Sequence, residues 1–159
     1  MLREFSAGGV VFKKESNKVL WLVTKSTPSK LFPKAFWRFP KGWLDDIDDG
    51  KNPGPLASGK KKATSDEIES AAIREVAEEA GVKAKVIKKI GTEKYFLDRG
   101  DGKTMKFVTY YLMEWARDLP EGYDSETAEV AWLPFDEARK RLAHSGSKKI
   151  LDKARELLV

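Results

Sequence analysis

One segment of this chain reads Arg74-Glu75-Val76-Ala77-Glu78-Glu79-Ala80-Gly81-Val82, a helical run of carboxylates that ends on a glycine. On a helix, Glu75, Glu78 and Glu79 stand at positions i, i+3 and i+4, so their carboxylates project from one side. Like charges at this spacing oppose helix formation unless a positive group lies among them. Arg74 offers Glu78 an i,i+4 partner, and a hard divalent cation would accept the carboxylate oxygens as ligands. The alternative is a solvated acidic helix face.

The same segment matches the pattern R-E-U-x-E-E-x-G-U, in which U is an aliphatic residue. The chain thereby resembles the Nudix hydrolases, which cleave a nucleoside diphosphate linked to another group. A second segment, Trp37-Arg38-Phe39-Pro40-Lys41-Gly42, resembles the W-x-F-P-K-G lead-in of many family members. The resemblance implies an α/β fold, with a Nudix-type α/β/α sandwich around a mixed β-sheet.

The first half of the family motif, G-x5-E-x7, fits this chain less well. Asp66 stands where the family has Glu, eight residues before Arg74. The glycine expected six residues earlier is replaced by Lys60, and Gly59 is one place out of register. We therefore take Gly42 as the first glycine, which implies an insertion of about 18 residues inside the motif.

The chain is expected to form a single Nudix hydrolase domain over residues 1–159, with the inserted loop at about 43–64. The glycines and prolines of the insertion predict a loop without regular structure. Asp45 lies where the family often carries another acid. The insertion is either a lid over the substrate or a solvated excursion.

The flanking sequence predicts alternating strands and helices. Thr64 and Glu67 form a capping-box pattern at the start of the motif helix, and Gly81 is suited to end it in a left-handed conformation. Runs of apolar and β-branched residues predict strands, and amphipathic patterns predict two C-terminal helices. The expected strands are 5–12, 19–23, 36–40, 84–96 (as one or two strands), 105–115 and 130–134, and the expected C-terminal helices are 135–143 and 148–158.

The composition describes a globular domain. Its 41% hydrophobic and 35% charged residues exclude a disordered chain, and the absence of cysteine excludes disulfides and thiolate metal sites. No apolar run approaches the length of a membrane span, and the N-terminus lacks the apolar centre of a signal peptide. The expected location is therefore cytoplasmic. The net charge of +5 suits a polyanionic substrate, a nucleic-acid surface or plain solubility, and does not choose among them.

The resemblance implies a Mg²⁺ (or Mn²⁺) site that supports attack of water on a phosphorus atom. Glu75 and Glu79 are the first expected ligands, and Glu78 completes the cluster. The backbone carbonyl of Lys41 matches a further family ligand.

The proton acceptor for the attacking water is left open among these glutamates and one residue from a distant loop. In the family, an acidic residue six positions before a tryptophan can join the metal site or act as general base. Here that residue is Glu126, six positions before Trp132, with Glu129 as its rival. The catalytic candidates are Glu75, Glu78, Glu126 and Arg74.

Four further residues are candidates for substrate binding. Lys106 begins a stretch that resembles the K-x-V-x-Y-x-L segment of the diadenosine polyphosphate hydrolases within the family. Tyr95 precedes a hairpin turn, and in that subfamily an aromatic residue near this place can stack on a purine. Lys41 is expected to contact phosphate, and Arg3 could reach phosphate or base. Each also has an ordinary structural explanation as a core tyrosine or a solvated cation.

The predicted function is metal-dependent hydrolysis of a pyrophosphate link in a nucleotide, with a dinucleoside polyphosphate as first candidate. One alternative is a pyrophosphatase for nucleoside triphosphates, oxidised purine nucleotides or ADP-ribose. Another is a non-catalytic Nudix-fold module that binds nucleotides or RNA. The expected partner is a small nucleotide substrate, with neither membrane nor nucleic acid, and the chain is expected to be a monomer or homodimer.

Overall fold

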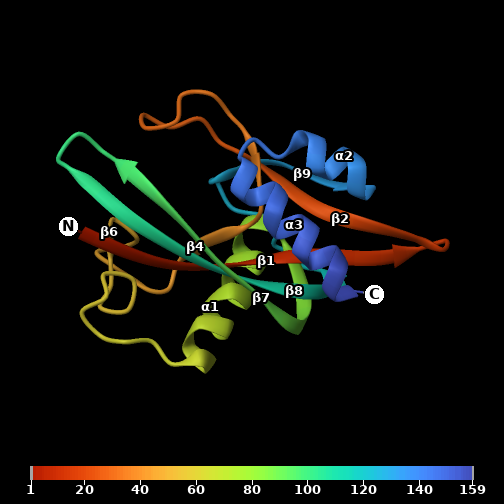
Figure 1. Cartoon of the computed structure of the whole chain (residues 1–159), viewed down its shortest axis with the longest axis horizontal. Coiled ribbons are helices and arrows are strands. Elements are labelled where there is room, and N and C mark those ends of the chain that lie inside the picture. Colours follow the sequence, from red (N-terminus) through yellow and green to blue (C-terminus); the bar gives the residue numbers. More distant parts are fainter. Residues whose placement is uncertain (1, 159) are drawn as a thin grey trace.

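The computed structural model describes residues 2–158, which form one curved mixed sheet with helices on both faces (Figure 1). Seven strands belong to this sheet, with the path β3-β2-β1-β8-β7 and with β4 and β9 paired to β1 and β2. Strands β1 and β8 run parallel, and the other pairs are antiparallel. The strands are β1 (Leu2–Glu15), β2 (Lys18–Ser26), β3 (Trp37–Arg38), β4 (Lys41–Trp43), β7 (Val82–Asp98), β8 (Lys103–Asp118) and β9 (Thr127–Leu133).

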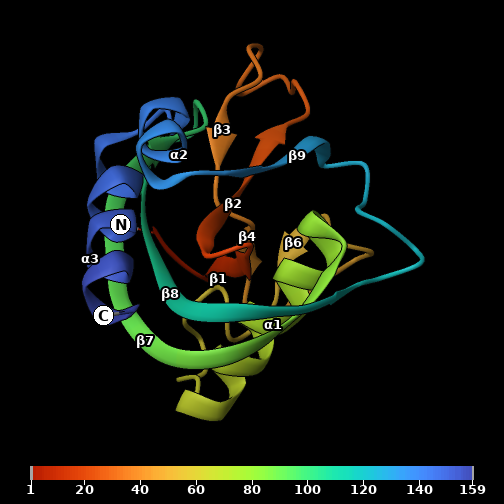
Figure 2. The ribbon, with the colours of Figure 1, turned by 90° about the vertical axis from the view of Figure 1, so that its right-hand side faces the viewer.

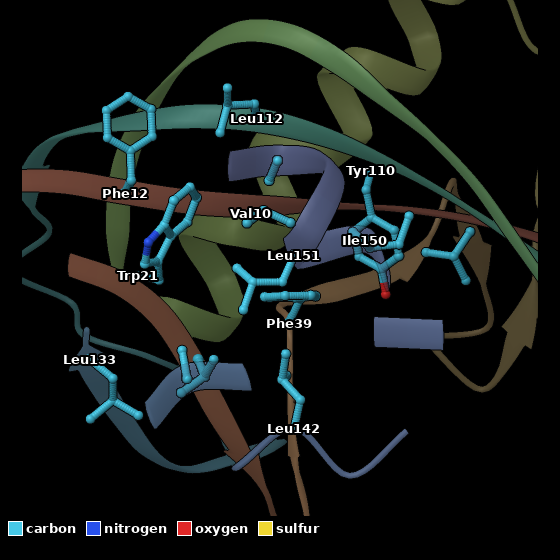
Figure 3. Packing of buried hydrophobic residues seen from close by; sticks show 14 residues of the cluster. Val10, Phe12, Trp21, Phe39, Tyr110, Leu112, Leu133, Leu142, Ile150 and Leu151 are labelled. Carbon is cyan, nitrogen blue, oxygen red and sulfur yellow. The ribbon is translucent and has the colours of Figure 1, made fainter. Parts of the chain in front are cut away.

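The three helices cover opposite faces of the sheet because residues along a strand alternate in direction. Val10 and Phe12 of β1 pack with α2 (Phe135–Arg141) and α3 (Ser145–Leu158), a cluster that Figure 3 shows. Ala7 and Val11, on the other face, pack with α1 (Ser65–Ala80). Figure 2 shows β7 and β8 bending in a wide arc, with α3 lying against β7. The predicted α/β/α sandwich around a mixed sheet is confirmed.

Helix α1 begins and ends where its local sequence predicts. The Thr64 hydroxyl accepts a hydrogen bond from the Glu67 amide at 3.1 Å, and the Glu67 carboxylate accepts one from the Thr64 amide at 3.0 Å. Gly81 closes the helix at φ 69°. The helix lies so close to β1 that a Cβ on Gly9 would come within 2.6 Å of a Val76 methyl. This close contact holds the carboxylates of α1 against the middle of the sheet.

Several boundaries differ from the sequence prediction. Residues 84–96 belong to one long strand with three register shifts, because bulges let β7 bend without breaking. The strand expected at 36–40 is limited to β3, since Pro40 cannot donate to a ladder. Lys41 and Gly42, which no expected strand contained, lie in β4, which pairs with β1. Within residues 2–158, no helix combines the length and the apolar character needed to cross a membrane.

The prediction that the insertion lacks regular structure is wrong. It contains a small hairpin of β5 (Asp46–Ile47) and β6 (Asn52–Pro53). The later half of the insertion is hydrogen-bonded to the rest of the domain. The Asp45 carboxylate accepts hydrogen bonds from the Leu56 and Ala57 amides at 3.0 and 2.7 Å. The Ala57 carbonyl accepts a hydrogen bond from the Phe5 amide of β1. Ala57 is completely buried. The insertion is therefore packed against the fold, and the solvated excursion is also wrong for this half.

Replacing Asp45 with Asn is expected to loosen this attachment. The NH2 of the new asparagine would point at one of the two backbone N–H groups, so that two donors would face each other. The loss of that hydrogen bond should lower the free energy of unfolding by about 1–3 kcal/mol. For a domain of this size, that cost lowers Tm by roughly 3–10 °C. Differential scanning calorimetry would measure it, with Asp49→Asn as the matched control, since Asp49 is exposed and its side chain makes no hydrogen bond to the described residues. A Tm within 1 °C of the parent would show that Asp45 does not secure the insertion.

Candidate functional site

The acidic face of α1 lines a polar cavity of about 300 Å³. Helical periodicity buries Glu75 and Glu79 with the core stripe, leaving them 9% and 1% exposed, while Glu78 stays at the rim with a side chain 49% exposed. The cavity is lined by Arg38, Lys41, Gly42, Trp43, Asp46, Gly50, Glu75, Glu78, Glu79, Arg99, Lys106, Asp124 and Glu126. Through Asp46 and Gly50, the insertion forms part of its wall.

Glu79 is the most deeply buried acid of the cavity. Its Oε1 accepts a hydrogen bond from the Lys41 amide at 3.2 Å and lies 3.8 Å from Nη2 of Arg38. Burial raises the pKa of Glu79 to about 8, and the neighbouring Glu126 adds to the rise although Arg38 and Lys41 oppose it. The positive charge of Arg38 and Lys41 therefore does not offset the burial of the Glu79 carboxylate.

Glu75 lies against the backbone of β4. A Cβ on Gly42 would overlap its carboxylate, so only glycine leaves room there. Burial, followed by the charge of Glu78, raises the pKa of Glu75 to about 7, and Arg74 only partly offsets this. Two adjacent buried carboxylates therefore lack a full complement of positive partners.

Arg74 fixes the outer side of the acidic face. Its guanidinium donates hydrogen bonds to the carbonyls of Trp43 and Leu44 at 2.9 and 3.3 Å. The same group lies 3.4 Å from the Glu75 carboxylate and 3.9 Å from that of Glu78. The predicted i,i+4 pair is present, and Arg74 also joins α1 to the chain that follows β4.

Glu126 reaches the cavity because its loop is tied to the end of α1. The Thr127 hydroxyl donates to the Glu79 carbonyl at 2.7 Å, and the Asp124 amide donates to the Glu78 carbonyl at 2.8 Å. These bonds bring Glu126 beside Glu79, from a place 47 residues further along the chain. Its rival Glu129 is exposed on β9 and does not line this cavity.

The donor set at the acidic wall suits a hard divalent cation. Carboxylate oxygens and a backbone carbonyl are the ligands that Mg²⁺ prefers, and positive charge would offset the raised pKa values of the buried glutamates. Within residues 2–158, no three acidic or histidine side chains already converge on one point. Glu75 is packed on Gly42, Glu79 accepts a hydrogen bond from the Lys41 amide and Glu78 is at the rim, so the three carboxylates have different partners.

A basic wall belongs to the same cavity. Lys106 and Arg99 line it together, and both are held by Glu4, which is 8% exposed. Glu4 accepts hydrogen bonds from Arg99 at 2.6 and 3.1 Å and from the Trp43 indole at 2.9 Å, and it lies 3.8 Å from the Lys106 ammonium. Burial and the nearby Lys41 lower the pKa of Lys106 to about 7, while Glu4 favours its charged form.

Sequence reasoning missed several members of this site, among them Arg38, Glu4 and Arg99. Arg38 occupies the x position of the W-x-F-P-K-G segment, for which the family pattern specifies no residue type. Glu4 and Lys106 are paired in register across the parallel strands β1 and β8, which a pairing prediction could have found. Arg99 carries no signal beyond its place in a turn. Asp66, aligned with the missing family glutamate, is exposed in the first turn of α1, where Glu67 performs the capping.

A second cavity, of about 460 Å³, shares Arg38 and Lys41 with the first in its lining. Five phenylalanine and tyrosine residues belong to its lining, and the predicted Tyr95 is among them. A third cavity, of about 370 Å³, shares Arg38 and Glu126 with the first. Arg38 thus lies where all three cavities meet.

Two further residues, Arg3 and His144, lie outside the first cavity. Arg3 is exposed on β1 and lines none of these cavities. His144 is exposed, and its ring packs edge-on against Phe36, with ring centroids 5.2 Å apart, in the wall of the second cavity.

Comparison with known proteins adds a family and several relatives. The model of the NUDIX domain matches residues 2–154. A protein of Mycobacterium tuberculosis that carries the name mutator protein MutT4 is 30% identical over 125 residues, which cover 79% of this chain. The chain spans about half the length of that relative, because the match covers 43% of it.

Solved structures share the fold at low sequence identity. An Ap4A hydrolase of Caenorhabditis elegans, in a binary complex, superposes with a TM-score of 0.64 at 19% identity, covering 98% of this chain and 97% of that one. The NUDIX domain of Shewanella oneidensis NrtR, in complex with ADP-ribose, superposes with a TM-score of 0.65 at 16% identity, covering 99% and 89%.

Proposed function

The chain belongs to the NUDIX domain family of hydrolases, and we propose that it hydrolyses a pyrophosphate link of a dinucleoside polyphosphate. One observation carries the proposal: the central cavity, which is lined by both acidic and basic residues, shares Arg38 with two further cavities, called the flanking cavities below. The central cavity suits a charged polyphosphate, and the flanking cavities offer places for its two nucleoside ends. A nucleoside triphosphate would use only one of them.

Glu75, Glu78, Glu79 and the Lys41 carbonyl would hold Mg²⁺ or Mn²⁺ on the acidic wall. When bound, such an ion polarises phosphoryl oxygens, lowers the pKa of the attacking water and neutralises the leaving phosphate. Arg74 keeps Glu75 and Glu78 in position through its bonds to the Trp43 and Leu44 carbonyls.

The cationic side chains bind the polyphosphate. Lys106, Arg99, Lys41 and Arg38 all line the central cavity, opposite or beside the glutamates. Glu4 orients Arg99 through two hydrogen bonds and favours the protonated form of Lys106. Charge-assisted bonds to phosphate are the strong ones, so these residues set the register of the phosphate chain.

Glu126 is the proposed proton acceptor for the attacking water. Glu126 lines the cavity beside Glu79 and is exposed there, whereas Glu79 is buried and its Oε1 accepts a hydrogen bond from the Lys41 amide. A water molecule beside the acidic wall can therefore reach the Glu126 carboxylate.

A panel of substrates tests the proposal. With Mg²⁺, diadenosine tetraphosphate is expected to be hydrolysed with higher kcat/KM than ATP, oxidised dGTP or ADP-ribose, because it can occupy both flanking cavities. Reaction in water labelled with heavy oxygen should place the label in one mononucleotide product. A preference of about tenfold or more for a triphosphate or ADP-ribose would overturn the dinucleotide assignment, and no turnover of any nucleotide would favour a binding module.

Replacing Tyr95 with Ala is expected to raise KM for diadenosine tetraphosphate by about tenfold, since stacking on an aromatic ring contributes roughly 1–3 kcal/mol per base. Steady-state kinetics and a Tm measurement on the same variant would separate lost stacking from lost packing, because Tyr95 also packs against the core. An unchanged KM in a stably folded variant would remove Tyr95 from the base site.

A further inference from the structure

The Glu93 carboxylate lies in the wall of the second cavity without a hydrogen-bonding partner. Its Oε2 is buried, and no donor within the described part of the chain reaches it. A buried acceptor without a partner is costly, and native structures keep few of them. Since Glu93 is not one of the residues that hold α1 or the acidic wall, its position calls for another explanation.

The surroundings of Glu93 act on its charge in both directions and leave its Oε2 without a hydrogen bond. Its Oε2 lies against Gly146 in the first turn of α3, where a Cβ would overlap it, and the positive end of the helix dipole favours an anion there. Burial raises the pKa of Glu93, and Lys41 and His144 oppose that rise. No amide of α3 donates to the carboxylate, so it does not serve as the helix cap.

The charge of Glu93 limits what the second cavity accepts. A carboxylate repels phosphate, so the phosphate chain stays with Lys106 and Arg99 in the central cavity. The aromatic walls, including Phe36 and Tyr95, suit a flat ring. A base placed there would present its polar edge to the carboxylate, which only accepts hydrogen bonds when ionised.

We propose that Glu93 selects guanine as the base in the second cavity, an inference that rests on the proposed function and names the nucleotide for its site. Guanine carries two neighbouring donors, N1–H and the N2 amino group, which match the two oxygens of one carboxylate. Adenine offers one amino group flanked by acceptors, which would oppose the second oxygen. The terminal torsion of glutamate is broad, so both oxygens can turn toward the base at little cost.

Binding of mononucleotides, measured by calorimetry without turnover, tests the inference. The parent protein is expected to bind GMP at least about tenfold more tightly than AMP, the discrimination typical of one bidentate contact. Glu93→Gln should abolish this preference, because an amide pairs its oxygen and nitrogen with the donor and acceptor edge of adenine. Glu129→Gln, the same change on an exposed strand position outside the cavities, should leave it intact.

Equal affinity of the parent for GMP and AMP, or an unchanged preference in Glu93→Gln, would overturn the inference. Because the measurement needs no catalysis, it stays informative even if the protein fails to hydrolyse dinucleoside polyphosphates. If hydrolysis also occurs, diguanosine tetraphosphate should exceed diadenosine tetraphosphate in kcat/KM, and Glu93→Gln should reverse that order.

Discussion

Replacing Glu79 with Gln is expected to lower kcat by about 10²-fold or more at saturating Mg²⁺. The substitution keeps size and helix propensity but removes a charge from the acidic wall, where Glu79 is 1% exposed and bonded to the Lys41 amide. Steady-state kinetics over a range of Mg²⁺ concentrations would measure the loss. Folding should survive, because a neutral group is easier to bury than a carboxylate.

Two further variants separate the roles within the acidic site. Glu126→Gln should lower kcat without changing the Mg²⁺ concentration at which activity is half-maximal. The reason is that Glu126 is proposed to accept a proton and not to hold the ion. Glu129→Gln, exposed on β9, should change neither. Activity of the Glu79 variant within about twofold of the parent would remove Glu79 from the catalytic site.

Replacing Gly42 with Ala is expected to lower kcat by about 10²-fold while the protein stays folded. The new methyl group would overlap the Glu75 carboxylate, which is the flexible end of a side chain and moves more easily than the strand. Displacing a catalytic group by about 1 Å can cost this much. The measurement is kcat together with Tm, and Tm should fall by only a few degrees.

A double-mutant cycle with Glu75→Gln tests this mechanism directly. If Gly42→Ala acts only by moving the Glu75 carboxylate, it should have little further effect once that carboxylate has been replaced. Fully additive losses would mean that Gly42→Ala damages the site in another way, such as through the pairing of β4 with β1.

The central helix and its acidic face could be predicted from the sequence because their causes are local. The capping box at Thr64, the closing Gly81 and the buried positions of α1 all involve residues within a turn of each other. The same reasoning placed the Arg74–Glu78 pair, which the structure contains at 3.9 Å. Local spacing also indicated the family, since the motif at Arg74 is contiguous.

The partners of that face were decided by tertiary structure, because they come from segments far apart in the chain. Glu4 meets Arg99 only through the pairing of β1 with β8 and the turn between β7 and β8, and Glu126 meets Glu79 only through the bonds that tie its loop to α1. Strand register and loop attachment depend on packing that no short segment contains.

The insertion and Glu93 illustrate the same division. Glycines and prolines in the insertion predicted a loop without regular structure, but the insertion contains a hairpin, and its attachment depends on Asp45 meeting the backbone of Leu56 and Ala57 and on Ala57 reaching Phe5. Glu93 reads as one polar residue in an alternating strand, and only the approach of α3 makes it a buried carboxylate without a partner. Local sequence thus accounts for the helix, its carboxylates and the family motif, whereas the residues that face them follow from long-range packing, because that packing joins elements that local interactions form independently.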